Sequence, residues 1–295
     1  MVAFLRYLIN GISLGSVYAI IALGYSMVYG IAKMLNFAHG DIIMVGAYIV
    51  FCVMVYLSMP PFLAVLAAIV VCTLLGIAIE RLAYKPLRQS ASLAVLITAI
   101  GVSYFLQNAA MLIWGSNPKV FSSVFNVGNL RMLNGELVIS SEALLTIAAN
   151  IIIMIGLTQF TSRTKMGKAM RAVSEDKGAA ELMGINVNRT ISLTFAIGSA
   201  LAAIAGALLC STTNPNLVPT TGSMPGIKAF TAAVFGGIGS IPGAFIGGLL
   251  LGVIEIMAKA YISTELSDAI VFAVLIIVLL FKPAGLLGKP VREKV

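Results

Sequence analysis

The sequence has little charge, since only 10% of its 295 residues are Asp, Glu, Lys or Arg, against about 25% in a typical soluble domain. A soluble fold of this length needs more polar side chains to cover its surface in water, so a cytosolic enzyme is excluded. The three cysteines (Cys52, Cys72 and Cys210) lie in apolar runs without paired spacing, and we predict neither a disulfide nor a metal site from them. The chain is 60% hydrophobic, which excludes disorder and predicts an all-α polytopic membrane protein.

Apolar segments near the roughly 20 residues that a helix needs to cross a bilayer are expected to form the spans. They are 7–32, 42–59, 62–79, 92–113, 143–160, 190–211, 227–239, 241–258 and 266–281. The segments 227–239 and 241–258 come from one long run that a Gly-rich stretch interrupts, and 227–239 is short enough to be a buried half-helix. Polar residues also interrupt the first segment, so we expect eight to ten transmembrane helices, some of them broken or re-entrant.

The basic residues, which give a net charge of +8, gather between the spans. Segments rich in Lys and Arg stay in the cytoplasm, so we predict that 80–90, 161–189 and the tail with Lys282, Lys289, Arg292 and Lys294 are cytoplasmic. The segments 114–142 and 212–226 are expected outside, and counting back places Met1 outside as well. Membrane topology therefore explains the positive charge, and no nucleic-acid partner is expected.

The long cytoplasmic connection 163–189 has a helical signature of its own. Ser174 and the acids Glu175 and Asp176 mark a helix start, and Gly184 marks a stop. Between them an apolar surface is expected from Ala179, Ala180, Leu182 and Met183. The segment is either an ordinary basic loop or a short amphipathic helix that sits in a groove on a partner protein.

Several motifs resemble one family. The spacing of Glu175, Asp176, Ala179, Ala180, Gly184 and Ile185 is similar to the coupling-helix motif of ABC importer permeases. The stretches NGISLGSVYAIIALGYSMVYG (10–30), LNFAHGD (35–41), IERLAYKPLR (79–88) and KAFTAAVFGGIGSIPGAFIGGLLLG (228–252) resemble the branched-chain amino acid permeases of the LivH type. The likeness runs nearly from end to end, and the outer segment 114–142 matches least.

The resemblance implies that 1–295 is one permease domain in the bacterial inner membrane, with the coupling loop at about 161–189. Implied partners are a second, LivM-like permease, two cytosolic ATPase subunits that hold ATP-Mg, and an extracytoplasmic protein that binds leucine, isoleucine or valine. No cofactor is expected on this chain. By family analogy the ATPase would contact Glu175, Asp176, Ala179, Ala180, Met183, Gly184 and Ile185.

The glycine-rich stretch 236–243 lacks the lysine of a phosphate-binding loop. We interpret Gly236, Gly237, Gly239, Pro242, Gly243 and Gly247 as a helix-packing or broken-helix segment, with contact to the solute as the alternative. The lone His39, with Asn36 and Asp41, is expected in a short cytoplasmic loop. His39 has no companion ligands for a metal, and helix capping accounts for Asp41.

Polar side chains inside the spans are candidates for the transport pathway, because a zwitterionic amino acid needs partners when it leaves water. They are Asn10, Ser13, Ser16, Thr98, Ser103, Gln107 and Asn108, each of which could instead bond between helices. A permease for urea or a short amide is an alternative function. An ion-coupled secondary transporter is less favoured, because the first six spans carry no ionisable residue. The charged residues Lys228, Glu255 and Asp268 lie near span ends. Glu255 is spaced to pair with Lys259 on the same helix.

Overall fold

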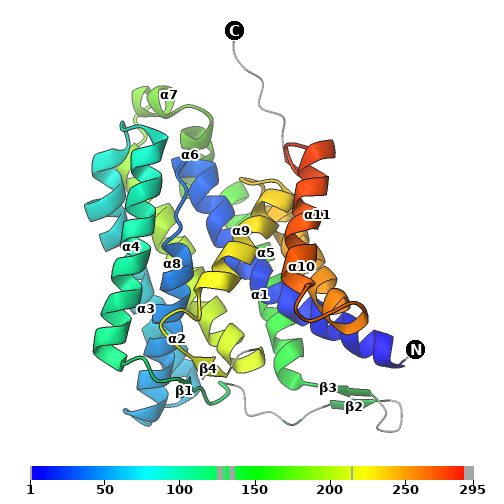
Figure 1. Cartoon of the computed structure of the whole chain (residues 1–295). Helices are drawn as coiled ribbons and strands as arrows, with labels where there is room; N and C mark the ends of the chain where they lie inside the picture. Colours follow the sequence, from blue (N-terminus) through cyan, green and yellow to red (C-terminus); the bar gives the residue numbers. More distant parts are fainter. Residues whose placement is uncertain (1, 125–127, 129, 133–136, 214, 289–295) are drawn as a thin grey trace.

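The computed structural model describes residues 2–124, 128, 130–132, 137–213 and 215–288, and it is a helical bundle with small strands at one end (Figure 1). The helices are α1 (Val2–Ala32), α2 (His39–Val55), α3 (Pro61–Ile79), α4 (Ser92–Trp114), α5 (Ser141–Arg163), α6 (Lys165–Glu175), α7 (Lys177–Leu182), α8 (Val187–Thr212), α9 (Ser223–Gly236), α10 (Ile241–Tyr261) and α11 (Ser267–Phe281). A π-helical turn (Glu80–Tyr84) and a 3-10 turn (Lys85–Leu87) extend α3. Met1, Lys289, Arg292 and Lys294, for which a side of the membrane was predicted, lie outside the described residues.

Two short antiparallel ladders close the end of the bundle opposite α7 (Figure 1). The strand β1 (Lys119–Val120) pairs with β4 (Asn216–Leu217), and β2 (Leu130–Met132) pairs with β3 (Leu137–Ile139). The two segments predicted to lie outside, 114–142 and 212–226, therefore meet at this end through β1 and β4, but 212–226 then returns into the bundle, where α9 begins. The Lys- and Arg-rich α6 and α7 lie at the other end, which is the cytoplasmic end by the charge rule.

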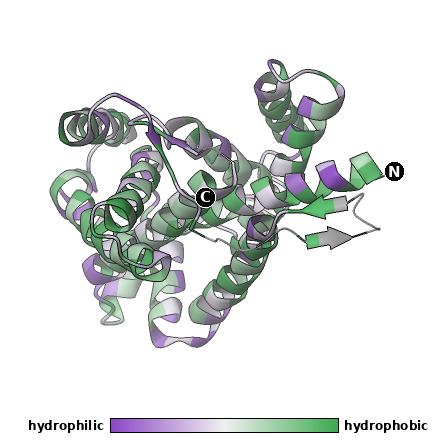
Figure 2. Cartoon of the chain, turned by 90° about the horizontal axis from the view of Figure 1, so that it is seen from below, coloured by the Kyte–Doolittle hydropathy of each residue, from purple (hydrophilic) through white to green (hydrophobic). Residues whose placement is uncertain are grey.

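The all-α polytopic prediction is confirmed. Among the described residues, six helices are long and apolar enough to cross a membrane, namely α1, α3 with its extension, α4, α5, α8 and α10, and α2 and α11 are shorter apolar helices. Seen from the strand end, the outward sides of the helices are mostly apolar (Figure 2). Such a surface suits lipid tails and a second membrane chain.

The helix α1 is the centre of the bundle, and α10, α8, α9 and α5 all pack against it. Its residues from Val17 to Leu23 are almost fully buried, whereas α4 exposes large side chains such as Phe105 (70% exposed) and Leu112 (87%). Small residues at the helix crossings, for example Gly46 against Ala203, let the backbones touch, which is how membrane helices gain packing energy without a hydrophobic drive.

The helices α2 and α9 begin in the middle of the bundle and run in opposite directions. The Cys72 thiol, halfway along the extended α3, lies 3.7 Å from the carbonyl oxygen of Ile42 in the first turn of α2. A Cβ built on Gly222, just before α9, would lie 1.8 Å from the Gly40 carbonyl oxygen, so only glycine permits this backbone contact. From this point α2 runs to the strand end and α9, with 14 residues, to the cytoplasmic end (Figure 1). The segment predicted as 227–239 is therefore a half-helix.

The cytoplasmic loop predicted for Asn36, His39 and Asp41 is wrong. These residues are 3%, 1% and 2% exposed, because the chain turns back into the bundle after α1, and the Tyr84 hydroxyl donates to Asn36 Oδ1 at 2.9 Å. Capping accounts for only part of the role of Asp41: its carboxylate accepts its own backbone N–H in the first turn of α2 and also accepts a hydrogen bond from Gln107. A short polar stretch between two apolar runs looks the same in sequence whether it faces water or a polar interior.

Candidate functional site

The cytoplasmic connection between α5 and α8 folds as two helices where one was predicted. The Thr164 hydroxyl accepts the Gly167 N–H at 2.9 Å and starts α6. The Asp176 carboxylate accepts the Ala179 N–H at 3.0 Å and starts α7. The prediction of a helix start at Asp176 therefore agrees with the structure, whereas Glu175 is the last residue of α6. Gly184 has a φ of +79° in the turn that follows α7, where its missing side chain avoids strain.

A hollow of about 380 Å³ lies between α6, α7 and the chain that follows, and it is lined by Ala172, Glu175, Asp176, Ala179, Ala180, Met183 and Ile185. The structure thus brings together all the predicted coupling residues except Gly184, which forms the turn. Beside the hollow, Leu182 is 91% and Met183 is 83% exposed. Glu175 and Glu181 are exposed in the same segment. The surface combines a concave apolar patch with acidic side chains, as a protein-docking surface does.

The helix α7 is tied to the transmembrane core. The Lys177 Nζ donates to the carbonyl oxygen of Ala32, the last residue of α1, at 3.0 Å. Burial, together with the positive charges of Arg88 and Lys33, lowers the pKa of Lys177. On the other side, α6 buries Met170 and Val173. The helix α7 is therefore joined to the last residue of α1, the central helix.

A second tie joins the cytoplasmic ends of α3 and α8. Arg88 pairs with the buried carboxylate of Glu80 and also donates to Asn188. The Ser192 hydroxyl donates to Glu80 Oε2 at 2.5 Å. Because Asn188 and Ser192 belong to the first turns of α8, the chain that follows the coupling loop is fixed to α3.

A cavity of about 280 Å³ lies in the middle of the bundle where α2 and α9 begin. It is lined by Tyr25, Phe37, Gly40, Asp41, Ile100, Ser103, Tyr104, Gln107, Ser223 and Ile227. Its polar wall centres on Gln107, whose Nε2 donates to Asp41 Oδ1 at 2.8 Å and lies 3.3 Å from the hydroxyls of both Ser103 and Ser223. Three elements distant in sequence, α2, α4 and α9, thus share one hydrogen-bonded cluster.

Of the predicted pathway residues, only Ser103 and Gln107 line this cavity. Ser13 is buried in α1, Ser16 donates to the Ile12 carbonyl at 2.8 Å, and Asn108 donates to the Tyr104 carbonyl at 2.7 Å. Asn10 is exposed and Thr98 is half-buried, both away from the cavity. The sequence analysis missed Asp41, Tyr25 and Ser223 as cavity residues. The sequence signal for Asp41 was a carboxylate next to a glycine in the motif LNFAHGD, and this carboxylate was interpreted as a helix cap.

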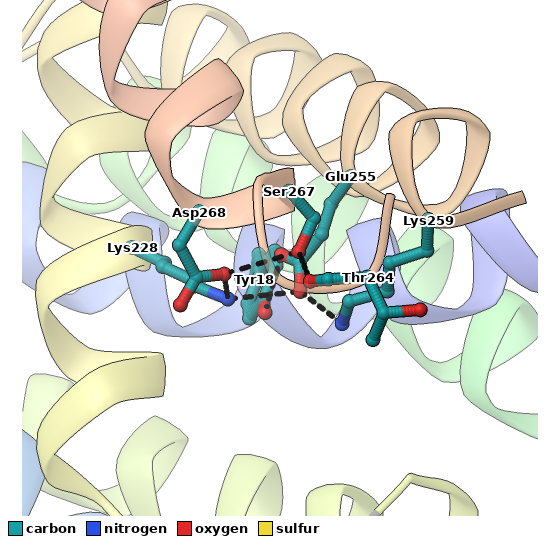
Figure 3. Close-up of polar contacts among 7 residues, drawn as sticks. All are labelled: Tyr18, Lys228, Glu255, Lys259, Thr264, Ser267 and Asp268. Carbon is teal, nitrogen blue, oxygen red and sulfur yellow. Dashed lines mark hydrogen bonds and ion pairs between the residues drawn. The ribbon is translucent and has the colours of Figure 1, made fainter. Parts of the chain in front are cut away.

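The charged residues of α9, α10 and α11 form a cluster whose centre, Lys228 and Glu255, is buried (Figure 3). Lys228 Nζ lies 2.8 Å from Glu255 Oε1 and 2.6 Å from Asp268 Oδ1. The predicted pair of Glu255 and Lys259 is confirmed, at 2.6 Å, and the Tyr18 hydroxyl donates to the other Glu255 oxygen at 2.9 Å. Lys228 and Glu255 are 6% and 1% exposed, so these charges face the inside of the bundle. Each charge in this cluster has an opposite partner.

The glycine-rich segment joins α9 to α10. A Cβ on Gly236 would lie 1.9 Å from the Gly243 carbonyl oxygen, and one on Gly247 would lie 2.2 Å from that of Ala232. Gly237 and Gly239 have φ angles of +110° and +90° in the connecting loop, and Pro242 lies in the first turn of α10. The structure thus places these residues in close helix packing and a tight turn at the cytoplasmic end, away from the cavity. Among the described residues, no group of three His, Cys, Asp or Glu side chains could hold a metal ion.

Comparison with known proteins gives a consistent result. Residues 7–279 match the family model described as a branched-chain amino acid transport system / permease component. The high-affinity branched-chain amino acid transport system permease proteins LivH of Salmonella typhimurium and of Escherichia coli K12 are each 47% identical to this chain, over 99% of its length and 98% of theirs. The permease protein BraD of Pseudomonas aeruginosa is 47% identical over the same shares.

Proposed function

The chain belongs to the family of branched-chain amino acid transport system permease components, and from this membership we propose that it is a membrane subunit of an ATP-driven importer. It is a permease and not itself an enzyme, and it lies in the plasma membrane as a multi-pass protein. In the proposed complex it forms half of the path for leucine, isoleucine and valine. A second homologous permease forms the other half, two cytosolic ATPases hold ATP-Mg, and an extracytoplasmic binding protein delivers the solute.

The observation that carries the proposal is the hollow of α6 and α7 together with its tie to α1. A protruding segment of an ATPase would fill the hollow against Ala179 and Met183, and Leu182 would pack against its side. Closure of the ATPases around ATP would move α7, and the bond from Lys177 to Ala32 would pass the movement to α1. The transport step is then a switch between two arrangements of packed helices, driven by the different contacts that the ATPases make in each.

An ion-coupled secondary transporter is the alternative from another class. It would rely on ionisable groups inside the spans, and the cluster around Lys228 is such a group of charges. Every charge of that cluster is paired within the chain, which favours a structural role. A permease for urea or another short amide differs only in its solute, and uptake measurements with each solute separate the two.

The test uses the complete complex in liposomes with leucine and ATP, and compares Leu182→Gln with Leu82→Gln. Both leucines are exposed on the cytoplasmic side, at 91% and 80%, but only Leu182 lies beside the hollow. We expect Leu182→Gln to lower both ATPase stimulation and leucine uptake about tenfold, because loss of a side chain that anchors an interface costs about 1–2 kcal/mol of binding free energy. We expect Leu82→Gln to leave both unchanged. Equal behaviour of the two variants, or leucine uptake driven by an ion gradient without ATP, would contradict the proposal.

A further inference from the structure

We propose that the cavity where α2 and α9 begin binds the transported solute, and that the Asp41 carboxylate receives the solute's protonated amino group. This inference rests on the proposed function and gives it a site and a chemical class, a zwitterion with an α-ammonium group and a small apolar side chain. It separates amino acids from solutes without a cationic group, such as urea.

The first argument is an unbalanced charge. Three carboxylates are almost completely buried in the described part of the bundle, those of Asp41, Glu80 and Glu255. Glu80 is paired with Arg88, and Glu255 with Lys228 and Lys259. Asp41 has only neutral donors, and no cation of the described residues lies within ion-pair distance of it. A buried charge without an opposite partner is costly, and an ammonium group supplied by the solute would balance it.

The second argument is the direction of the two half-helices. The first turns of α2 and α9 both border the cavity, through Gly40 and Ser223. The first backbone N–H groups of a helix carry partial positive charge and favour anions. Half-helices that begin at the middle of a membrane protein place this charge where a solute carboxylate can reach it. Because Asp41 itself lies in the first turn of α2, the cavity offers this carboxylate to the ammonium group and the first turn of α9 to the solute's carboxylate, which suits a zwitterion.

The third argument is size and lining. The volume of about 280 Å³ is just below the range for sites of drug-sized ligands, about 300–1,000 Å³, so it suits a solute of few atoms. Phe37, Ile100 and Ile227 supply apolar walls against which a branched side chain would pack. The polar groups that fix orientation gather around Gln107.

The open side of the cavity faces outward from α4. Its rim is formed by Ile100 (42% exposed) and Tyr104 (63%). A cavity with a carboxylate cannot face lipid tails, because polar groups at that depth must be covered by protein or water. We infer that the second permease subunit covers this side, so that the solute is held between the two chains.

The main experiment compares Asp41→Asn and Asp41→Glu with the control Asp268→Asn in the complete complex. Asp268 also lies in the first turn of a helix, but it borders the cluster of Lys228 and not the cavity. Leucine uptake is measured per ATP hydrolysed. Asn keeps the shape of the side chain but removes the charge that would bind the ammonium group, so we expect a loss of about 10- to 100-fold for Asp41→Asn. Asp41→Glu should lose less, and Asp268→Asn should stay within about twofold.

Three results would overturn the inference. The first is unchanged uptake per ATP in Asp41→Asn, and the second is an equal loss in Asp41→Asn and Asp268→Asn. The third is a parallel fall of uptake and ATPase activity that leaves their ratio unchanged, which would make Asp41 structural. If the unmodified complex fails to import leucine with ATP, the proposed function fails, and that outcome is visible before any variant is made.

A second measurement keeps the test decisive if Asp41→Asn does not assemble. Ile227→Cys, in a complex whose chain has its native cysteines replaced by alanine, is labelled with a small maleimide while leucine or 4-methylpentanoate is present. The second compound has the same apolar chain and carboxylate but no amino group. We expect leucine to slow labelling at least threefold and 4-methylpentanoate to leave it unchanged. Protection by both compounds equally, or by neither, would contradict the assignment of Asp41.

Discussion

Replacing Glu255 with glutamine should destabilise the protein strongly. Glu255 accepts bonds from Tyr18, Lys228 and Lys259 at 2.6 to 2.9 Å and is 1% exposed. The neutral amide leaves Lys259 without an anion among the described residues and Lys228 with Asp268 alone. Breaking a buried pair by removing one partner costs about 3–5 kcal/mol, which lowers the ratio of folded to unfolded protein by about 10²- to 10⁴-fold.

The matched control is Asp268→Asn. The Asp268 side chain is 40% exposed, and Lys228 keeps Glu255 when it is lost, so the expected cost is about 0–1 kcal/mol. Unfolding in mixed micelles with increasing denaturant can be followed by the fluorescence of Trp114, the only tryptophan, whose ring stacks on Tyr48 at 4.5 Å. Equal midpoints for Glu255→Gln and Asp268→Asn would refute the reasoning. Partial recovery in the double variant Lys228→Met with Glu255→Leu would support it, because the charges left without these partners, on Asp268 and Lys259, have side chains that are 40% and 34% exposed.

Two further predictions concern backbone geometry. Gly222→Ala would force a Cβ to within 1.8 Å of the Gly40 carbonyl oxygen, so we expect the free energy of unfolding to fall by about 1–3 kcal/mol in the same assay. The control Gly101→Ala, with no atom within 4 Å of its Cβ, should change little. Equal effects of the two variants would contradict the crossing of α2 and α9. Asp176→Ala removes the cap of the six-residue α7 at a cost of about 0.5–2 kcal/mol, and stimulated ATPase activity should fall with it; full activity would show that α7 needs no cap.

Much of the fold could be predicted from the sequence. Long apolar runs indicate helices that cross the bilayer, and clustered Lys and Arg residues indicate segments on the cytoplasmic side. The start of α7 at Asp176 and the stop at Gly184 were also readable, since capping and a positive φ depend on local chemistry. The separate helix α6 was missed. Its buried residues, Met170 and Val173, are set between basic residues, and the charge pattern of a loop concealed the apolar stripe.

The middle of the bundle could not be predicted. Whether Asp41 faces water or a cavity depends on the chain turning back after Ala32, which no local pattern encodes. Likewise Lys228, Glu255 and Asp268 come from three helices, and their meeting depends on how α9, α10 and α11 pack. Ser103 and Gln107 were found because they are polar side chains inside an apolar span, whereas their partner Ser223 lies 116 residues from Gln107.

The account depends most on the contact between α7 and an ATPase, and cross-linking measures this contact directly. Leu182→Cys and the control Val120→Cys, which lies in β1 at the opposite end and is 73% exposed, are treated with a short thiol cross-linker in the assembled complex. The account predicts that Leu182→Cys is joined to an ATPase subunit, with a yield that changes when ATP is added, and that Val120→Cys is not. A Leu182→Cys that forms no cross-link and reacts with a soluble maleimide equally fast with and without the ATPases would contradict it.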